Sequence, residues 1–355
     1  MKGILHENTV SERGTSTSVL EYARALQDHA GIDISLAFRS SESHNARIVD
    51  LWRSEFQTLE YRDMHDLERQ ASRFGADFLY AQKSGRVNST YLGGVRLLVH
   101  AVFQEYEPHG DSYAYISDWL AQAVQKNLKL RMRYEIGLSR NGSSLSKIRQ
   151  RNLPSPPPFP TPVDFRKFKA VPYIVRKLSA QSDFRLPLGI PQDAFVLGSL
   201  SGSTQFDIPF VRDWIPKYLS MSSQHYFLCP NIMPFLDHPR AIFLPKILEE
   251  QAKADYLMCL DAMIHARQMG ESFGMALCEA LSVGKPVLSW NGGHDQNHVQ
   301  ILRDTNWLYQ NQSDLERAVI ELRDNNADYV PEAQSLVEQY TPTRVVQRFR
   351  DVFAI

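Results

Sequence analysis

The sequence has few cysteines, no long apolar run and no excess of charge of one sign. Its three cysteines, Cys229, Cys259 and Cys278, lie in apolar surroundings without a CxxC partner. This favours reduced, buried thiols over a disulfide framework or a zinc site. No stretch reaches the ~18 apolar residues that span a bilayer, and residues 1–14 lack the apolar core of a signal peptide. We therefore expect a soluble, cytoplasmic protein, at most peripheral to the inner face of a membrane.

Basic residues are nevertheless concentrated in one segment. The chain has 39 Lys and Arg against 40 Asp and Glu, a net charge of −1, which argues against a nucleic-acid-binding protein. Within Lys126–Arg151, however, eight basic residues stand against the single acidic Glu135. A solvated helix face is one interpretation. The other is a docking surface for an anionic acceptor or for membrane lipid headgroups. The segment lacks the interleaved aromatic side chains of a nucleic-acid stacking platform.

Short apolar segments alternate with helical patterns, which is typical of βαβ units and parallel sheets. In the first half, helices are expected over Thr15–Gln27 and directly after Ser117. The strands expected there are Gly3–Leu5, Ile32–Phe38, Asp77–Tyr80, Val95–Val99 and Tyr113–Ile116. In the second half, the expected strands are Phe195–Leu200, Tyr226–Cys229, Ala241–Leu244, Tyr256–Ile264 and Pro286–Trp290. Helices are expected there at about Lys246–Ala254, Phe273–Val283, Gln312–Asp324 and Thr341–Phe353.

A proline-rich stretch divides the two halves. Leu153–Val163 has six prolines in eleven residues, so it is neither helix nor central strand and is typical of a stiff connection. We expect an α/β protein with two Rossmann-like domains that face each other across a cleft. They would cover residues 1–165 and 166–338, and a last helix, 339–355, would cross back to the first domain. In such sheets ligands bind at the carboxyl ends of the strands.

Two glutamates stand on either side of an apolar helix start. Glu271 and Glu279 are eight residues apart, separated by Ser272–Gly274 and an almost wholly apolar stretch. A buried carboxylate without partners is strongly destabilising, so each is expected to meet a polar group. Because the helix follows a strand, its free amides and positive dipole end favour a phosphate. Eight residues of helix span roughly 12 Å, comparable with the separation of ribose and hexose in a nucleotide diphosphate sugar.

The segment Glu271–Leu288, ESFGMALCEALSVGKPVL, resembles the E-x7-E signature of retaining glycosyltransferases of the GT-B fold, in particular glycosyltransferase family 4. The match comprises Glu271, Phe273, Gly274, Glu279, Ala280, Gly284, Lys285, Pro286 and Val287. The resemblance implies an acceptor-side first domain and a second domain that binds a nucleotide sugar. It also implies that Glu279 binds the ribose hydroxyls of the donor and that Glu271 acts at the donor sugar. The diphosphate would lie over the amides of Ser272, Phe273, Gly274 and Met275.

One departure from the family pattern concerns the diphosphate. Family members carry an Arg and a Lys after the first strand of the second domain, whereas residues 199–210, SLSGSTQFDIPF, contain no basic residue. Gly202 and Ser203, with Thr204, would supply hydrogen bonds there, or another cation would compensate. Arg267, just before Glu271, is the first candidate for that cation and Lys246 the second, because a leaving diphosphate needs charge stabilisation.

Further candidates come from other segments. His100 ends the apolar strand VRLLVH, and family members place an active-site histidine at about this position; a structural histidine is the alternative. His109 is a weaker rival on a turn. Gly14-Thr15 resembles the glycine loop that approaches donor phosphate and acceptor, although a plain turn also fits.

A metal site and the donor loop raise two more questions. The spacing of His265, His294 and His298 fits no usual zinc pattern, and GT-B enzymes generally work without a bound metal, so no metal or other cofactor is expected. Asn291–Gly293 resembles the donor loop of the family. The glutamate that usually follows is replaced by Asn297-His298.

The leading hypothesis is therefore a retaining, metal-independent glycosyltransferase of the hexosyltransferase class. It would move a sugar from a nucleotide diphosphate sugar to a hydroxyl of an unidentified acceptor, which could be a glycan, a lipid or a small molecule. Two alternatives stay open. One is a GT-B epimerase acting on the same donor, and the other is a non-catalytic protein that binds nucleotide sugars.

Overall fold

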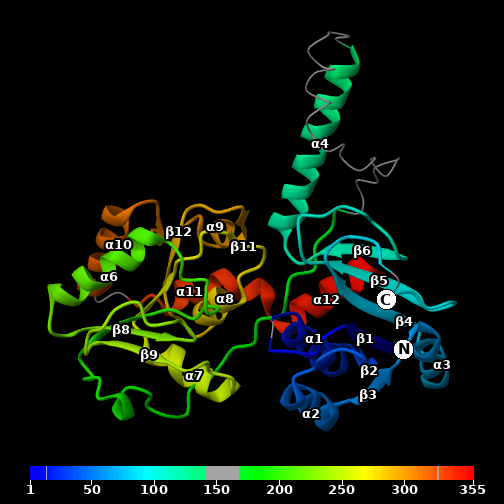
Figure 1. Cartoon of the computed structure of the whole chain (residues 1–355), viewed down its shortest axis with the longest axis horizontal. Helices are drawn as coiled ribbons and strands as arrows, with labels where there is room; N and C mark the ends of the chain where they lie inside the picture. Colours follow the sequence, from blue (N-terminus) through cyan, green and yellow to red (C-terminus); the bar gives the residue numbers. More distant parts are fainter. Residues whose placement is uncertain (13, 89, 141–167, 326–327) are drawn as a thin grey trace. The chain divides into compact units, whose positions relative to one another are not determined.

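The computed structural model describes residues 1–12, 14–88, 90–140, 168–325 and 328–355, except for the side chains of 131–140. The chain divides into two compact units. Unit 1 comprises Met1–Ser11, Leu26–Val171 and Arg348–Ile355, and unit 2 comprises Glu12–Ala25 and Pro172–Gln347. Each unit has a parallel β-sheet flanked by helices (Figure 1). Two helices, α1 (Gly14–Ala30) and α12 (Pro342–Phe353), have residues in both units.

The sheet of unit 1 has six parallel strands in the order β3-β2-β1-β4-β5-β6. Their bounds are Lys2–Glu7 (β1), Asp33–Arg39 (β2), Gln57–Tyr61 (β3), Phe78–Lys83 (β4), Arg96–Ala101 (β5) and Ser112–Tyr115 (β6). Central positions such as Ile4 and Leu5 have no exposed surface, as expected for a parallel sheet covered by helices on both faces. Because all strands run in one direction, their carboxyl ends form a single edge.

The helices of unit 1 start at side chains that cap free amides. The elements are α2 (Ala46–Glu55), α3 (Met64–Phe74) and α4 (Asp118–Arg140). Asn45 caps α2, and the Asp63 carboxylate accepts a hydrogen bond from the Asp66 amide at 2.8 Å at the start of α3. The Ser117 hydroxyl accepts one from the Leu120 amide at 3.1 Å, so the predicted cap of α4 is confirmed.

Unit 2 contains a second sheet of six parallel strands, in the order β14-β12-β10-β7-β8-β9. These strands are Phe195–Gly198 (β7), His225–Pro230 (β8), Ala241–Leu244 (β9), Ala262–His265 (β10), Val287–Trp290 (β12) and Leu308–Tyr309 (β14). A small separate sheet pairs Gly270–Glu271 (β11) with Asp295–Gln296 (β13). Counted from its own first strand, the large sheet repeats the strand order of unit 1. This is the order of dinucleotide-binding α/β folds.

The helical elements of unit 2 surround these sheets (Figure 1). They are α6 (Pro209–Met221), α7 (Glu250–Cys259), α8 (Met275–Ser282), α9 (Asn297–Leu302), α10 (Gln312–Asp324), α11 (Val330–Val337), and the 3₁₀ turns Leu186–Leu188 and Glu338–Tyr340. The predicted α/β class with parallel sheets is confirmed. The bounds of the two predicted domains remain a prediction.

One strand prediction is wrong. Tyr256 and Leu257 belong to α7, and the strand predicted over Tyr256–Ile264 begins only at Ala262. The helix predicted from Lys246 begins correspondingly later. A short apolar run fits a buried helix as well as a strand, and here both flanks of the run are buried. The error leaves the carboxyl end of β10, and with it the candidate site, where the sequence placed it.

The last helix completes the core of unit 1, as predicted. The ring of Phe349 on α12 lies 5.4 Å from that of Tyr80 on β4, and the ring of Phe353 lies 6.2 Å from it. The Arg348 guanidinium donates a hydrogen bond to the Ala170 carbonyl at 2.7 Å and pairs with Asp118. These contacts hold the end of the chain in unit 1.

Several predictions concern the surface and the thiols. All three cysteines are free and buried, as predicted. In the described part of the chain, no helix combines the length and apolar character that crossing a membrane needs. Of the basic segment, Lys126 and Lys129 lie on α4, and the side chains of Arg131, Arg133 and Arg140 are not described. Residues 141–151 and the proline-rich stretch lie outside the described residues.

Candidate functional site

Glu271 lies on β11 beside a histidine and an arginine. The Oε1 atom of Glu271 is 3.2 Å from Nε2 of His265, the last residue of β10, and 3.0 Å from Nη1 of Arg267. The Glu271 side chain is 20% exposed. Burial raises the pKa of this carboxyl, but the hydrogen bond with His265 and the charges of His265 and Arg267 outweigh it, so the net pKa is below its ordinary value. Glu271 is therefore a charged, oriented carboxylate at the carboxyl end of the sheet.

Two buried histidines contact Glu271. Nδ1 of His265 lies 2.8 Å from the Ser289 hydroxyl. His298 accepts a hydrogen bond at Nδ1 from the Glu271 amide at 3.3 Å, and its Nε2 donates to the Trp290 carbonyl at 3.0 Å. Each ring thus has both nitrogens occupied. His294 pairs with the neighbouring Asp295 instead. Across the described residues, no group of three or more His, Cys, Asp and Glu side chains is suited to hold a metal ion.

Two glycines shape the backbone around Glu271. Gly270 has φ +75°, and a Cβ placed there would lie 1.9 Å from the Asp295 carbonyl oxygen. Gly274, with φ +94°, is the N-cap of α8 and provides no side chain that could cap the first amides. These amides therefore remain available at the positive end of the helix dipole. Such an end can bind an anion.

The segment between the two glutamates is anchored from within unit 2. The Phe273 side chain is buried, with its ring 5.1 Å from that of Tyr173 and 5.2 Å from that of Tyr340. The side-chain amide of Asn297 donates to the Phe273 carbonyl at 2.7 Å. Phe273 therefore contributes its backbone to the helix start, and its ring belongs to the core.

Glu279 lies one turn into α8 and pairs with a lysine of α7. Its Oε1 atom is 2.5 Å from Nζ of Lys253, and its side chain is 13% exposed. Burial lowers the pKa of Lys253, but the nearby Glu279 carboxylate raises this pKa by more, so the net pKa is above its ordinary value. The predicted helical spacing of 12 Å is wrong in one respect. Helix α8 begins at Met275, so only part of the interval from Glu271 is helical.

No protein-family model matches the sequence, and no curated protein matches it. Solved structures do. The fold is similar to that of Anabaena Alr3699/HepE in complex with UDP and glucose, with a TM-score of 0.64 and 13% identity over 100% of this chain and 99% of that one. A glycosyltransferase from Rickettsia africae ESF-5 gives a TM-score of 0.65 at 11% identity, over 99% of this chain and 97% of that one. A mutant of S. aureus TarM in complex with Fondaparinux, alpha-GlcNAc-glycerol and UDP gives a TM-score of 0.65 at 9% identity, over 100% of this chain and 99% of that one.

The chain has the GT-B fold. At these identities the likeness concerns the fold alone. In this GT-B chain, every candidate for donor binding lies in unit 2, whereas His100 lies in unit 1.

The remaining donor-site candidates differ in their surroundings. Gly202 follows β7, and its amide donates to the side-chain oxygen of Gln205 at 3.1 Å, while Ser203 is exposed. Gly14 is the first residue of α1, with open space where a side chain would be, and Thr15 is half-buried. Lys246 forms an ion pair with Glu12. Their roles in binding remain predictions.

His100, expected as an active-site histidine with a structural histidine as the alternative, is buried near the end of β5. It has no exposed surface, its Nδ1 lies 2.6 Å from the Tyr80 hydroxyl, and its Nε2 donates to the Val171 carbonyl at 2.8 Å. The ring of Phe353 on α12 lies 6.0 Å away. Burial lowers the pKa of His100 to about 4, and the hydrogen bond to Val171 offsets only part of that effect. This environment favours the structural alternative.

Lowering the pH from 7 towards 5 is expected to weaken unit 1 through His100. The folded state keeps this ring neutral down to about pH 4, whereas the unfolded chain binds a proton near pH ~6.5. Stability then rises with pH between these values, by about 1.4 kcal/mol per unit for one proton, and is level above them. Urea unfolding of His100→Gln at several pH values should show a smaller change of unfolding free energy with pH, by the amount due to one proton. His65→Gln, at an exposed position, is the control; equal slopes in both variants would contradict the prediction.

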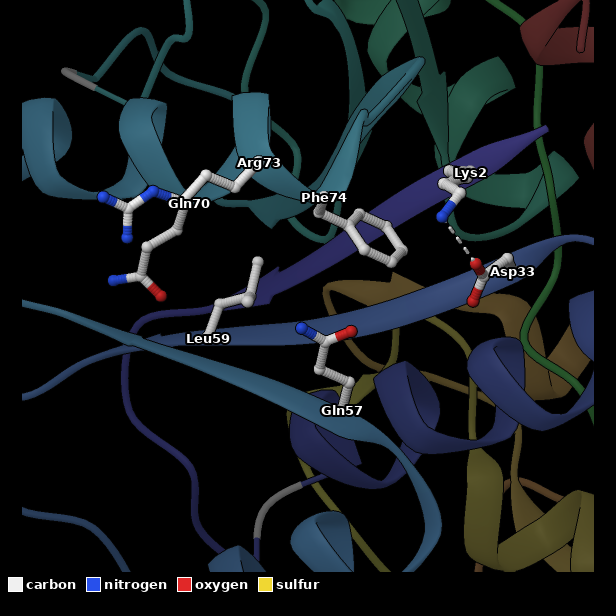
Figure 2. A pocket seen from close by; sticks show the side chains of 7 residues that line it. All are labelled: Lys2, Asp33, Gln57, Leu59, Gln70, Arg73 and Phe74. Carbon is white, nitrogen blue, oxygen red and sulfur yellow. Dashed lines mark ion pairs between the residues drawn. The ribbon is translucent and has the colours of Figure 1, made fainter.

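A pocket in unit 1 lies away from the strand ends that bind ligands in such folds. Figure 2 shows that it opens at the amino-terminal side of the sheet, where Lys2 and Asp33 form an ion pair at 3.1 Å. It is lined by Lys2, Asp33, Gln57, Leu59, Gln70, Arg73 and Phe74. Ligands of doubly wound sheets bind at the carboxyl ends of strands, so we assign no part of the candidate site to this pocket.

Proposed function

We propose that this protein is a retaining glycosyltransferase, similar to family 4, that transfers a sugar from a nucleotide diphosphate sugar to an acceptor hydroxyl. One observation carries the proposal. In a chain with the GT-B fold, two oriented carboxylates, Glu271 and Glu279, stand on either side of the uncapped amino end of α8. A diphosphate fits the helix end by charge and by hydrogen bonding. The carboxylates fit the diols at the two ends of such a donor.

Each end of the donor then has its own partner. Glu279, held by Lys253 at 2.5 Å, accepts hydrogen bonds from the ribose hydroxyls. Glu271, held by His265 and Arg267, accepts them from the donor sugar. The leaving diphosphate itself takes the proton of the acceptor hydroxyl, so the retaining reaction needs no protein base opposite the anomeric carbon.

Arg267 is the best-placed cation for the diphosphate. It is 27% exposed and lies 3.0 Å from Glu271, eight residues before the first residue of α8. Its pairing with Glu271 neutralises part of its charge before the donor binds. When the sugar hydroxyls reach Glu271, the guanidinium can share its donors between the carboxylate and a phosphate oxygen, because it has five N–H groups. That charge stabilises the leaving group.

The donor nucleotide to test first is UDP, since the similar HepE and TarM structures contain UDP. We expect UDP and one UDP-sugar to raise the free energy of unfolding of unit 2, by about 2.7 kcal/mol at a hundredfold excess over Kd. Glu279→Ala should abolish this stabilisation. Glu316→Ala is a matched control, because Glu316 on α10 forms a similar ion pair, at 2.8 Å, with Lys217 on α6. Urea unfolding with and without UDP- and GDP-sugars measures both effects, and no binding of any nucleotide sugar in calorimetric titration would refute the proposal.

A second candidate function is a protein that binds nucleotide sugars without catalysis. The absence of a basic residue from 199 to 210, where the family carries an Arg and a Lys, favours it. Release of UDP from a bound UDP-sugar, followed in water over hours, separates the two. Turnover supports the transferase, and stable binding without turnover in the presence of an acceptor panel supports the binder.

A further inference from the structure

A group of basic side chains at the carboxyl edge of the unit 1 sheet takes no part in the proposed donor site. Arg39 is the last residue of β2, and Lys83 is the last residue of β4, with β1 between these strands. His6 on β1 lies opposite Ala37 and Ala81. Arg39 comes two residues after Ala37, and Lys83 comes two residues after Ala81. Because side chains two residues apart point to the same face of a sheet, Arg39, Lys83 and His6 share one face. The backbones at Arg39 and Lys83 are about 10 Å apart across β1, and the charges of both side chains act on the His6 ring between them.

Lys83 is a buried cation without a carboxylate. Only 6% of it is exposed, and its Nζ donates to the Thr90 carbonyl at 3.2 Å. It also donates to Nε2 of His109 at 3.1 Å, which is an acceptor because Nδ1 of the same ring donates to the Glu107 carbonyl at 2.7 Å. Within the described part of the chain, no carboxylate pairs with Lys83. The third N–H of the ammonium group remains for a ligand.

The surroundings of Lys83 add positive charge and one further free donor. Burial lowers the pKa of Lys83 to about 8, so the group is charged at neutral pH. Burial, followed by the charges of Lys83 and Arg39, lowers the pKa of His6 to about 3. The Arg39 Nε atom is buried and has no hydrogen-bond partner among the described residues. Nε2 of His6 lies 2.5 Å from the Tyr61 hydroxyl, and the Arg39 side chain also hydrogen-bonds to Tyr61.

A buried charge without a counter-charge is destabilising, whereas the same charge facing an anion is not. We propose that Lys83 and Arg39 form an anion site that binds a phosphate or carboxylate group carried by the acceptor. Lys83 supplies a point charge and one N–H, and Arg39 supplies its Nε–H. Naming the acceptor as the carrier rests on the proposed function; the binding of an anion at this site does not.

The test is a titration of the full chain labelled with [¹³Cε]lysine. The Lys83 signal is assigned by its loss in Lys83→Met and is followed against methyl phosphate and against acetate at constant ionic strength. A saturable shift of this signal with methyl phosphate, acetate or both supports the site, and the stronger response identifies the anion. Lys2, paired with Asp33 on the surface, is the control signal. No saturable response of Lys83 to either probe would overturn the proposal.

Stability distinguishes a binding role from a structural one. If Lys83 serves a ligand, Lys83→Met removes an uncompensated charge, so the urea midpoint without anion should be unchanged or higher. A lower midpoint together with a silent Lys83 signal would mean that its bonds to Thr90 and His109 are merely structural. Because neither measurement uses a nucleotide sugar, a shifted Lys83 signal in a chain that fails to bind donors would refute the proposed function alone.

Discussion

Glu271→Gln is expected to lower the turnover of a UDP-sugar by about 100-fold or more while leaving UDP binding unchanged. The carboxylate offers two acceptor oxygens to the sugar hydroxyls, whereas glutamine offers one oxygen and an NH₂ group that can only donate. In the proposed site, Glu279 and α8 bind the nucleotide end of the donor, so UDP affinity should not change. Turnover is measured as release of UDP with water as the acceptor, and UDP affinity is measured by calorimetry.

The fold should survive this substitution. The glutamine oxygen can still accept from Arg267, which lies 3.0 Å from the carboxylate, so the free energy of unfolding should fall by less than about 2 kcal/mol. The control is Glu316→Gln on α10, which breaks a comparable ion pair with Lys217. Wild-type turnover in Glu271→Gln, and also in Glu279→Ala, would contradict the proposal that these two glutamates bind the donor.

Much of the fold could be predicted because local signals agree with tertiary packing. Strand β9 (Ala241–Leu244) and helix α10 (Gln312–Asp324) have the predicted bounds, since each is bordered by turn or capping residues. Helices α2 and α3 were not predicted, although Asn45 and Asp63 are recognisable caps. The run starting at Tyr256 was mistaken for a strand. In that run nearly every position is apolar, so the periodicity that separates the two structures is lost.

The candidate site could be predicted only where it is local in sequence. Glu271, Gly274 and Glu279 lie within nine residues, and their spacing identifies the helix start. Lys253, which holds Glu279, lies 26 residues away, and nothing in its own segment indicates the pairing. His100 illustrates a contact that sequence alone does not reveal. Its place near the end of β5 suggests exposure, but the chain's last helix returns to cover it, a contact that only the tertiary structure reveals.

Gly270→Ala is expected to be the most damaging small substitution in unit 2. A methyl group at this position would meet the Asp295 carbonyl at 1.9 Å and the His298 ring at 2.8 Å, and the backbone has φ +75°. The clash with backbone cannot be relieved by a side-chain rotation, so β11 must move away from β13. We expect a loss of about 2–3 kcal/mol in the free energy of unfolding, measured in urea. Donor turnover should fall as well, because Glu271 moves with β11.

Gly189→Ala separates backbone strain from the clash. Gly189 also lies in unit 2 with a positive φ of +66°, but no atom lies within 4 Å of its added methyl group. It should therefore lose only the ~1–2 kcal/mol of the left-handed conformation and keep wild-type turnover. A similar loss of turnover in both variants would mean that strain anywhere in unit 2 impairs activity. A loss of turnover in Gly270→Ala alone would show that activity depends on the position of the Glu271 amide, which donates to His298 at 3.3 Å. The close contact of β11 and β13 would then set the direction of the Glu271 carboxylate.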